Sequence, residues 1–148
     1  MKIRTMKIED YEHVYQLWMT IQGFGIRSID DSREGVERFL KRNPTTSVIA
    51  EEDGKIVGSI LCGHDGRRGC LYHVCVDQKY RRNGIGKAMV FYAMKQLKEE
   101  KINQVSLITF SENDIGNAFW NTMEWAERKD LNYYDFTLNE ENMTAFNA

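Results

Sequence analysis

The sequence predicts an α/β fold in one domain, and three observations support this prediction. Helical and extended patterns alternate along the chain, with three consecutive strand patterns in the middle and a strand-helix-strand unit in the second half. The length of 148 residues suits one domain with a sizeable core. No Gly/Ser-rich linker or internal repeat divides the chain, so we expect residues 1–148 to fold as a single unit.

The first elements are a strand and two helices. A short strand is predicted over 2–6, and apolar residues then recur at helical spacing from Tyr11 to Ile21. We expect the second helix to begin near Asp31, because Glu34 three residues later completes a capping-box pattern.

Three antiparallel strands are predicted next, over 47–50, 55–61 and 70–76. The first two are separated by Asp53 and Gly54, a dipeptide that favours a tight hairpin because both central residues need a positive φ. The third has the β-branched and aromatic content of a central strand.

The second half continues with alternating helices and strands. A long helix is predicted to begin at Ile85, followed by a strand over 104–109 and a helix over 115–123. The alternating segment 131–138 predicts the last strand.

Composition excludes several classes of protein. Twenty Lys and Arg against 22 Asp and Glu give a net charge of −2, so no nucleic-acid partner is expected. No apolar stretch approaches the roughly 20 residues that cross a bilayer, so we expect no membrane association and a cytoplasmic location. Cys62, Cys70 and Cys75 lack C-x-x-C spacing, so neither a disulfide framework nor a metal site is expected.

The segment from Arg81 to Lys87 has the pattern of an anion-binding loop. It lies between a predicted strand and the first turn of a long helix, where unpaired N–H groups and the helix dipole favour a phosphate. Gly84 and Gly86 allow a close approach of the backbone. Ala88 and Met89 occupy positions where a P-loop and a dinucleotide loop need Ser/Thr and Gly, so neither ATP nor NAD is indicated.

Arg81-x-x-Gly84-x-Gly86 after a central strand resembles the acyl-CoA pyrophosphate loop of the GNAT (Gcn5-related N-acetyltransferase) superfamily. Asn113, followed by the aromatic pair Phe119-Trp120, is similar to the second landmark of that family. The turn 63–69 resembles one in the small bacterial YpeA-like acetyltransferases. The resemblance covers the whole predicted element order and implies a mixed, mostly antiparallel twisted sheet of about six or seven strands flanked by about four helices.

The resemblance implies acetyl-CoA as co-substrate and a set of residues that bind it. The central strand would hydrogen-bond the pantetheine arm, the loop would hold the diphosphate, and Asn113 with the aromatic pair would contact the thiol end. The implied residues are Val74, Cys75, Val76, Arg81, Arg82, Asn83, Gly84, Ile85, Gly86, Lys87, Asn113, Phe119 and Trp120.

The catalytic residues of the family are not reproduced in this sequence. Many members place a tyrosine second in the aromatic pair to protonate the leaving thiolate, but the indole of Trp120 cannot serve as an acid. The positions of the family's glutamate base correspond to Cys70 and Ile108.

Two tyrosines on the predicted strands are candidates to replace the missing acid and base. Alternation over 70–76 predicts that Tyr72 shares one face with Cys70, Val74 and Val76, which makes it a catalytic candidate. His73 is then expected on the other face as a hydrogen-bonded core residue. Tyr134, on the predicted last strand, is the second catalytic candidate.

The resemblance implies an acyl-CoA-dependent N-acyltransferase that acetylates a primary amine by direct attack. The alternative is a non-catalytic acyl-CoA-binding regulatory module, which the missing acid and base favour. A protein-interaction domain would require the loop pattern to be accidental. The acceptor, whether a small molecule or a peptide, is left open, and a homodimer is possible because dimers are common in the family.

Overall fold

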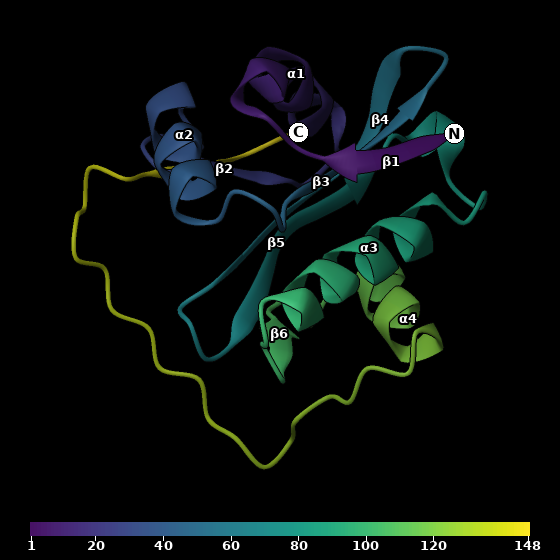
Figure 1. The fold of residues 1–148 in the computed structure, drawn as a ribbon. Coiled ribbons are helices and arrows are strands. Elements are labelled where there is room, and N and C mark those ends of the chain that lie inside the picture. Colours follow the sequence, from purple (N-terminus) through teal and green to yellow (C-terminus); the bar gives the residue numbers. More distant parts are fainter.

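The computed structural model describes residues 1–148 and contains a central sheet with helices on both faces (Figure 1). The strands are, in spatial order, β1 (Lys2–Thr5), β3 (Val48–Glu52), β4 (Lys55–His64), β5 (Gly69–Val76) and β6 (Val105–Leu107). Neighbours are antiparallel except β5 and β6, which are parallel. This mixed, mostly antiparallel sheet confirms the predicted fold class.

Each face of the sheet is covered by two helices, and each has its own apolar core (Figure 1). The helices are α1 (Tyr11–Thr20) and α2 (Arg33–Arg42) on one face, and α3 (Ile85–Glu99) and α4 (Asp114–Thr122) on the other. A short helix, η1 (Ile8–Asp10), leads into α1. None of these helices is long and apolar enough to cross a membrane.

The hairpin between β3 and β4 forms at the predicted dipeptide. Asp53 has a φ of 51° and Gly54 a φ of 77°, so both central residues adopt the left-handed conformation that this tight turn requires. A local sequence signal was sufficient here because the turn's conformation depends on those two residues alone.

A β-bulge at His73 overturns the predicted alternation along β5. His73 has a φ of 50°, and the register shifts so that Ile60 of β4 lies opposite both His73 and Val74. Tyr72 faces Phe39 and His73 faces Trp18, so both side chains lie on the α1/α2 face. Val74 joins the α3 side, so the prediction that it shares a face with Tyr72 was wrong.

The predicted start of α2 was wrong by one residue, for a tertiary reason. Ser32 is the N-cap, and its hydroxyl oxygen accepts a hydrogen bond from the Gly35 N–H at 3.1 Å. Asp31 is buried and directs its carboxylate to His73 and to the Arg27 N–H instead.

The predicted strand over 131–138 does not form. This segment is extended but has no strand partner, and it lies on a long path around the outside of the molecule between α4 and β7 (Figure 1). The C-terminal strand is β7 (Thr144–Phe146), which pairs with β2 (Gly25–Arg27), and neither was predicted. Alternation shows that a segment can form a strand, but pairing also requires an available edge.

A partly buried ion pair connects β1 to η1 and predicts acid sensitivity. The Arg4 guanidinium donates two hydrogen bonds of 2.9 Å to Asp10. Burial opposes ionisation of Asp10, but the hydrogen bonds from Arg4 and from the Lys7 N–H lower the pKa of Asp10 below its ordinary value. Because the folded-state pKa is lowered, this stabilisation is present above about pH 4 and is lost as the pH falls through the folded-state pKa.

We therefore expect Asp10→Asn to lower the free energy of unfolding by about 1–3 kcal/mol at neutral pH and by much less near pH 2. Urea unfolding at the two pH values measures both differences. Glu12→Gln, which breaks the exposed pair with Arg33, is the control and should cost under about 1 kcal/mol. Equal losses from Asp10→Asn at both pH values would contradict the assignment.

Candidate active site

The loop that joins β5 to α3 presents a row of unpaired backbone donors. The N–H groups of residues 82–87 have no hydrogen-bond partner, and the first helical bond of α3 runs from Ala88 N–H to Gly84 O. Gly84 is the N-cap and makes no side-chain cap, unlike Ser32 of α2 and Asn113 of α4. The uncapped N-terminus of α3 therefore combines free donors with the positive end of a helix dipole.

The backbone conformation of this loop makes the donors converge. Arg82 has a φ of 67° and Gly84 a φ of 76°, and left-handed residues among neighbouring N–H groups form an anion-binding concavity. A side chain on Gly84 would meet open space, whereas one on Gly86 would lie 3.3 Å from the Phe119 ring. Gly86 is thus needed for packing and Gly84 for the loop conformation.

The charged side chains of the loop have different orientations. The Arg81 guanidinium turns back, and its Nε donates to the Val76 carbonyl at 3.1 Å. Asn83 donates to the Tyr80 carbonyl within the same turn. Arg82 and Lys87 are exposed, and Lys87 extends over the Phe91 ring. The loop therefore keeps its positive charge beside the free N–H groups.

One edge of β5 is available next to this loop. Strand β6 pairs only with Gly69–Leu71, so the rest of that edge has no strand partner. The Asp77 N–H donates to Val57 of β4, and amide groups alternate in direction along a strand, so Val74 and Val76 direct theirs to the open edge. Cys75 pairs with Ser59 of β4 instead, and its thiol is buried.

Helix α4 lies next to the start of α3, and its predicted binding residues make contacts within the fold. The Asn113 Oδ1 accepts from the Gly116 N–H at 3.0 Å and thereby caps α4. The Phe119 ring packs over Gly86 at the start of α3. The Trp120 indole packs between Phe119 and Trp125, with ring centroids 4.9 and 4.7 Å away.

The two catalytic candidates are placed very differently. Tyr72 lies on β5 with its ring 6.0 Å from Phe39, and partial burial raises its pKa to about 12, so it keeps its proton at neutral pH. Tyr134 is 87% exposed and lies on segment 131–138. Its role as a catalytic candidate depended on a strand in this segment, and that strand does not form. Tyr133 of that segment contributes to the raised pKa of Tyr72.

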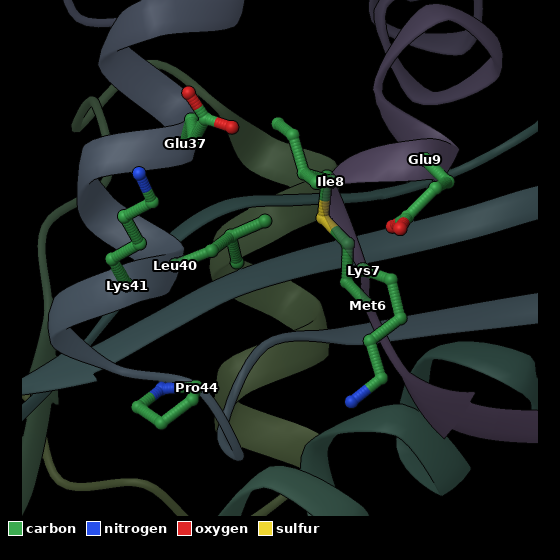
Figure 2. Close-up of a pocket in the computed structure, with 8 residues that line it drawn as sticks. All are labelled: Met6, Lys7, Ile8, Glu9, Glu37, Leu40, Lys41 and Pro44. Atoms are coloured by element: carbon green, nitrogen blue, oxygen red, sulfur yellow. The ribbon is translucent and has the colours of Figure 1, made fainter.

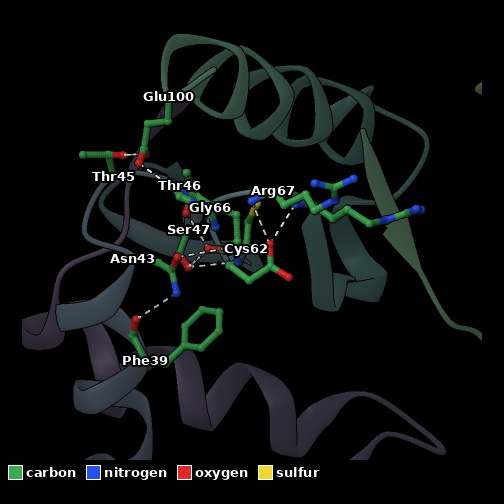
Figure 3. Close-up of polar contacts among 12 residues, drawn as sticks. Phe39, Asn43, Thr45, Thr46, Ser47, Cys62, Gly66, Arg67 and Glu100 are labelled. Carbon is green, nitrogen blue, oxygen red and sulfur yellow. Dashed lines mark hydrogen bonds and ion pairs between the residues drawn. The ribbon is translucent and has the colours of Figure 1, made fainter. Parts of the chain in front are cut away.

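A second polar cluster, which includes His64, lies at the opposite end of β5, and Figure 3 labels Thr45, Gly66 and Glu100 among its members. The His64 Nδ1 accepts from the Gly66 N–H at 2.9 Å, and its Nε2 pairs with Glu100 at 2.8 Å. Thr45 donates to the same Glu100 carboxylate, and Asp65 accepts from two N–H groups of the turn. These contacts tie the β4–β5 hairpin to the end of α3.

A shallow hollow beside η1 and α2 is separate from the loop and from β5 (Figure 2). Lys7, Glu9, Glu37 and Lys41 lie at its rim around Leu40, and none of the predicted binding residues lines it. No group of three or more His, Cys, Asp or Glu side chains is arranged to hold a metal ion. The uncapped loop and the open edge of β5 are therefore the best candidate for a binding site.

Comparison with known proteins decides the family. The model of the acetyltransferase (GNAT) family matches residues 11–125. The chain belongs to this GNAT family. An acetyltransferase of Sodalis glossinidius is 31% identical to this GNAT chain over 125 residues, which cover 84% of the chain and 87% of the relative. The protein is therefore an acetyltransferase.

Solved acetyltransferase structures have the same fold at low sequence identity. The PaiA N-acetyltransferase of Thermoplasma acidophilum, solved with coenzyme A, has a TM-score of 0.70 and 19% identity over 82% of this chain and 87% of its own. The aminoglycoside acetyltransferase AAC(6')-Iy, solved with a bisubstrate analogue, has a TM-score of 0.69 and 18% identity over 92% and 97%. The fold observed for this chain is therefore the fold of these solved acetyltransferases.

Sequence reasoning missed one pair of residues in this GNAT domain. His73 Nε2 lies 2.9 Å from Asp31 Oδ1, a contact between β5 and the segment before α2. Asp31 was interpreted as part of a helix cap and His73 as a core residue on the opposite face from Tyr72. The only sequence signal was a histidine next to a tyrosine on the central strand, and its meaning depended on the bulge.

Proposed function

We propose that this GNAT protein transfers the acetyl group of acetyl-CoA to a primary amine by direct attack of the amine on the thioester. The observation that carries the proposal is the row of unpaired N–H groups over 82–87, placed beside the unpaired edge of β5. A diphosphate needs several converging donors, and an amide-bearing arm needs a free strand edge.

The residues present fit both halves of acetyl-CoA. Backbone donors of the loop, with Arg82 and Lys87, suit the diphosphate, and the N–H groups of Val74 and Val76 with the Val74 carbonyl suit the pantetheine arm. Bound acetyl-CoA would supply the activated acetyl group. The protein would hold this group at the bulge of β5 and would exclude competing orientations of the amine.

Structures of related fold support the choice of co-substrate and acceptor class. PaiA was solved with coenzyme A, and AAC(6')-Iy with a bisubstrate analogue that joins CoA to an aminoglycoside derivative. The raised pKa of Tyr72, about 12, keeps a proton on its hydroxyl, so it could donate to the departing thiolate. Use of acetyl-CoA and three cysteines without a disulfide support the expected cytoplasmic location.

The alternative is a regulatory module that binds acyl-CoA without turnover. Two observations favour it: the Trp120 indole is engaged in aromatic packing rather than in acid catalysis, and Tyr134 lies away from the sheet on an unpaired segment. Oriented binding alone supplies much of the rate of acyl transfer, so the loss of one acid is compatible with activity.

Titration calorimetry with acetyl-CoA, followed by thiol release in the presence of amines, tests the proposal. The acceptors are kanamycin, spermidine and a peptide with a free N-terminal alanine. We expect binding together with amine-dependent release of CoA. Binding without release to any acceptor would support the regulatory alternative, and absence of binding would overturn both.

A further inference from the structure

His73 is held by a buried carboxylate in a fixed orientation. Asp31 is 4% exposed, and its Oδ1 lies 2.9 Å from His73 Nε2 while its Oδ2 accepts from the Arg27 N–H at 2.7 Å. The imidazole packs against the rings of Trp18 and Phe24, with centroids 4.8 and 4.7 Å away. Carboxylate and rings together fix both the position and the plane of the imidazole.

The same contacts determine which ring nitrogen carries the lone pair. A carboxylate accepts hydrogen bonds, so the neutral imidazole places its proton on Nε2 and its lone pair on Nδ1. Every buried side-chain nitrogen or oxygen in the structure has a hydrogen-bond partner, and His73 makes a single hydrogen bond through Nε2. Nδ1 is therefore accessible to solvent as a free acceptor.

The strained backbone at His73 determines the face of the sheet on which the imidazole lies. A φ of 50° within a strand is unfavourable for a residue other than glycine. The resulting bulge moves the imidazole onto the same face as Tyr72, directly before Val74, whose amide groups line the open edge of β5. His73 therefore has its backbone next to the open edge of β5, where acetyl-CoA is proposed to bind, and its side chain on the α1/α2 face.

We propose that His73 is the proton acceptor for the attacking amine and that Asp31 is its positioning residue. This inference depends on the proposed function. An amine that arrives as an ammonium ion loses one proton to His73 Nδ1, and its nitrogen then bonds to the acetyl carbon. The carbon–sulfur bond breaks, the thiolate takes a proton from the Tyr72 hydroxyl, the second amine proton restores that hydroxyl, and His73 returns the first amine proton to solvent.

Two tyrosines and a cysteine on this face keep their protons at neutral pH. Burial raises the pKa of Tyr11, whose hydroxyl donates to the Asp31 carbonyl, to about 12. Burial also raises the pKa of Tyr72 to about 12 and that of Cys75 to about 11. Asp31 is the carboxylate that contacts the ring. The imidazole is thus the group on this face with a free nitrogen lone pair for the amine proton.

Two substitutions test the roles separately. His73→Gln keeps an N–H donor for Asp31 but has no base, so kcat with the best of the three amines should fall by about 10²–10⁴. The KM for acetyl-CoA should stay unchanged, and the rise of kcat with pH through the neutral range should disappear. Asp31→Asn would donate to Nε2, move the imidazole proton to Nδ1 and remove the free acceptor.

His64→Gln is the matched control, because His64 also pairs with a carboxylate, at 2.8 Å from Glu100, but at the far end of β5. Its kcat should equal that of the wild type. Nitrogen-15 NMR of the imidazoles gives a readout independent of turnover: His73 should be the Nε2–H tautomer in the wild type and the Nδ1–H tautomer in Asp31→Asn.

Two results would overturn the inference while leaving the proposed function intact. One is a His73→Gln enzyme with the kcat and pH profile of His64→Gln, and the other is a loss confined to the KM for acetyl-CoA. A wild-type protein that binds acetyl-CoA and acetylates none of the amines would instead contradict the proposed function, and the pair would then be a structural contact only.

Discussion

Replacement of Gly84 by aspartate should weaken acetyl-CoA binding by about a hundredfold or more. Two unit charges about 4 Å apart near a protein surface interact by about 4 kcal/mol, and a hundredfold loss corresponds to about 2.7 kcal/mol. The new carboxylate would also accept hydrogen bonds from the free N–H groups of residues 82–87, which are the donors proposed for the diphosphate. Titration calorimetry measures the loss.

Two control variants separate charge from backbone strain. Gly84→Asn has nearly the same shape without the charge, and asparagine tolerates a φ of 76°. Gly54→Asp places the same carboxylate at a φ of 77°, again in open space, but in the β3–β4 hairpin. Both controls should bind acetyl-CoA within about threefold of the wild type. If Gly84→Asp binds as tightly as Gly84→Asn, the loop is not the diphosphate site.

Replacement of Trp18 by alanine should have the largest effect on stability. Its side chain is completely buried in the α1/α2 core, and its Nε1 donates to the Ser59 hydroxyl at 3.1 Å. Loss of a buried tryptophan costs about 3–5 kcal/mol through lost transfer energy and the cavity that remains. Because Trp18 also packs against His73, the imidazole should lose its fixed orientation in any fraction that stays folded.

Urea unfolding of three variants measures this effect. Trp18→Phe keeps most of the packing but leaves the Ser59 hydroxyl without its donor, so it should cost less than Trp18→Ala. Tyr134→Ala removes an aromatic side chain that is 87% exposed and should change stability by under about 0.5 kcal/mol. A loss below about 1 kcal/mol for Trp18→Ala would show that the core around α1 is not packed as observed.

Features that depend on neighbouring residues could be predicted from the sequence. The Asp53-Gly54 turn has the positive φ values expected of it, and the Gly84 loop has the left-handed conformation and uncapped helix start that suit an anion. Both depend on local backbone preferences, which one short segment contains in full. The family resemblance was visible for the same reason, since its landmark in 81–86 is a contiguous motif.

The face of each side chain on β5 depended on tertiary contacts. Period-two alternation placed His73 opposite Tyr72, but the bulge, at which the imidazole contacts Trp18 and Asp31, brought both to one face. A one-residue bulge reverses the face of every later residue, and no pattern within 70–76 reports it. The proton acceptor was therefore assigned to the core by sequence reasoning.

In the C-terminal region, too, local pattern and tertiary pairing gave different results. Segment 131–138 has the alternation of a strand and remains unpaired, whereas the three residues of β7 pair with β2, more than a hundred residues earlier in the chain. The sequence by itself determined the helices and strands from β3 to α4, the hairpin turn and the loop that suits a phosphate, because these depend on local backbone preference. Only the tertiary structure decided which edges pair and which side chains meet, because strand pairing and the His73–Asp31 contact join residues that are distant in the chain.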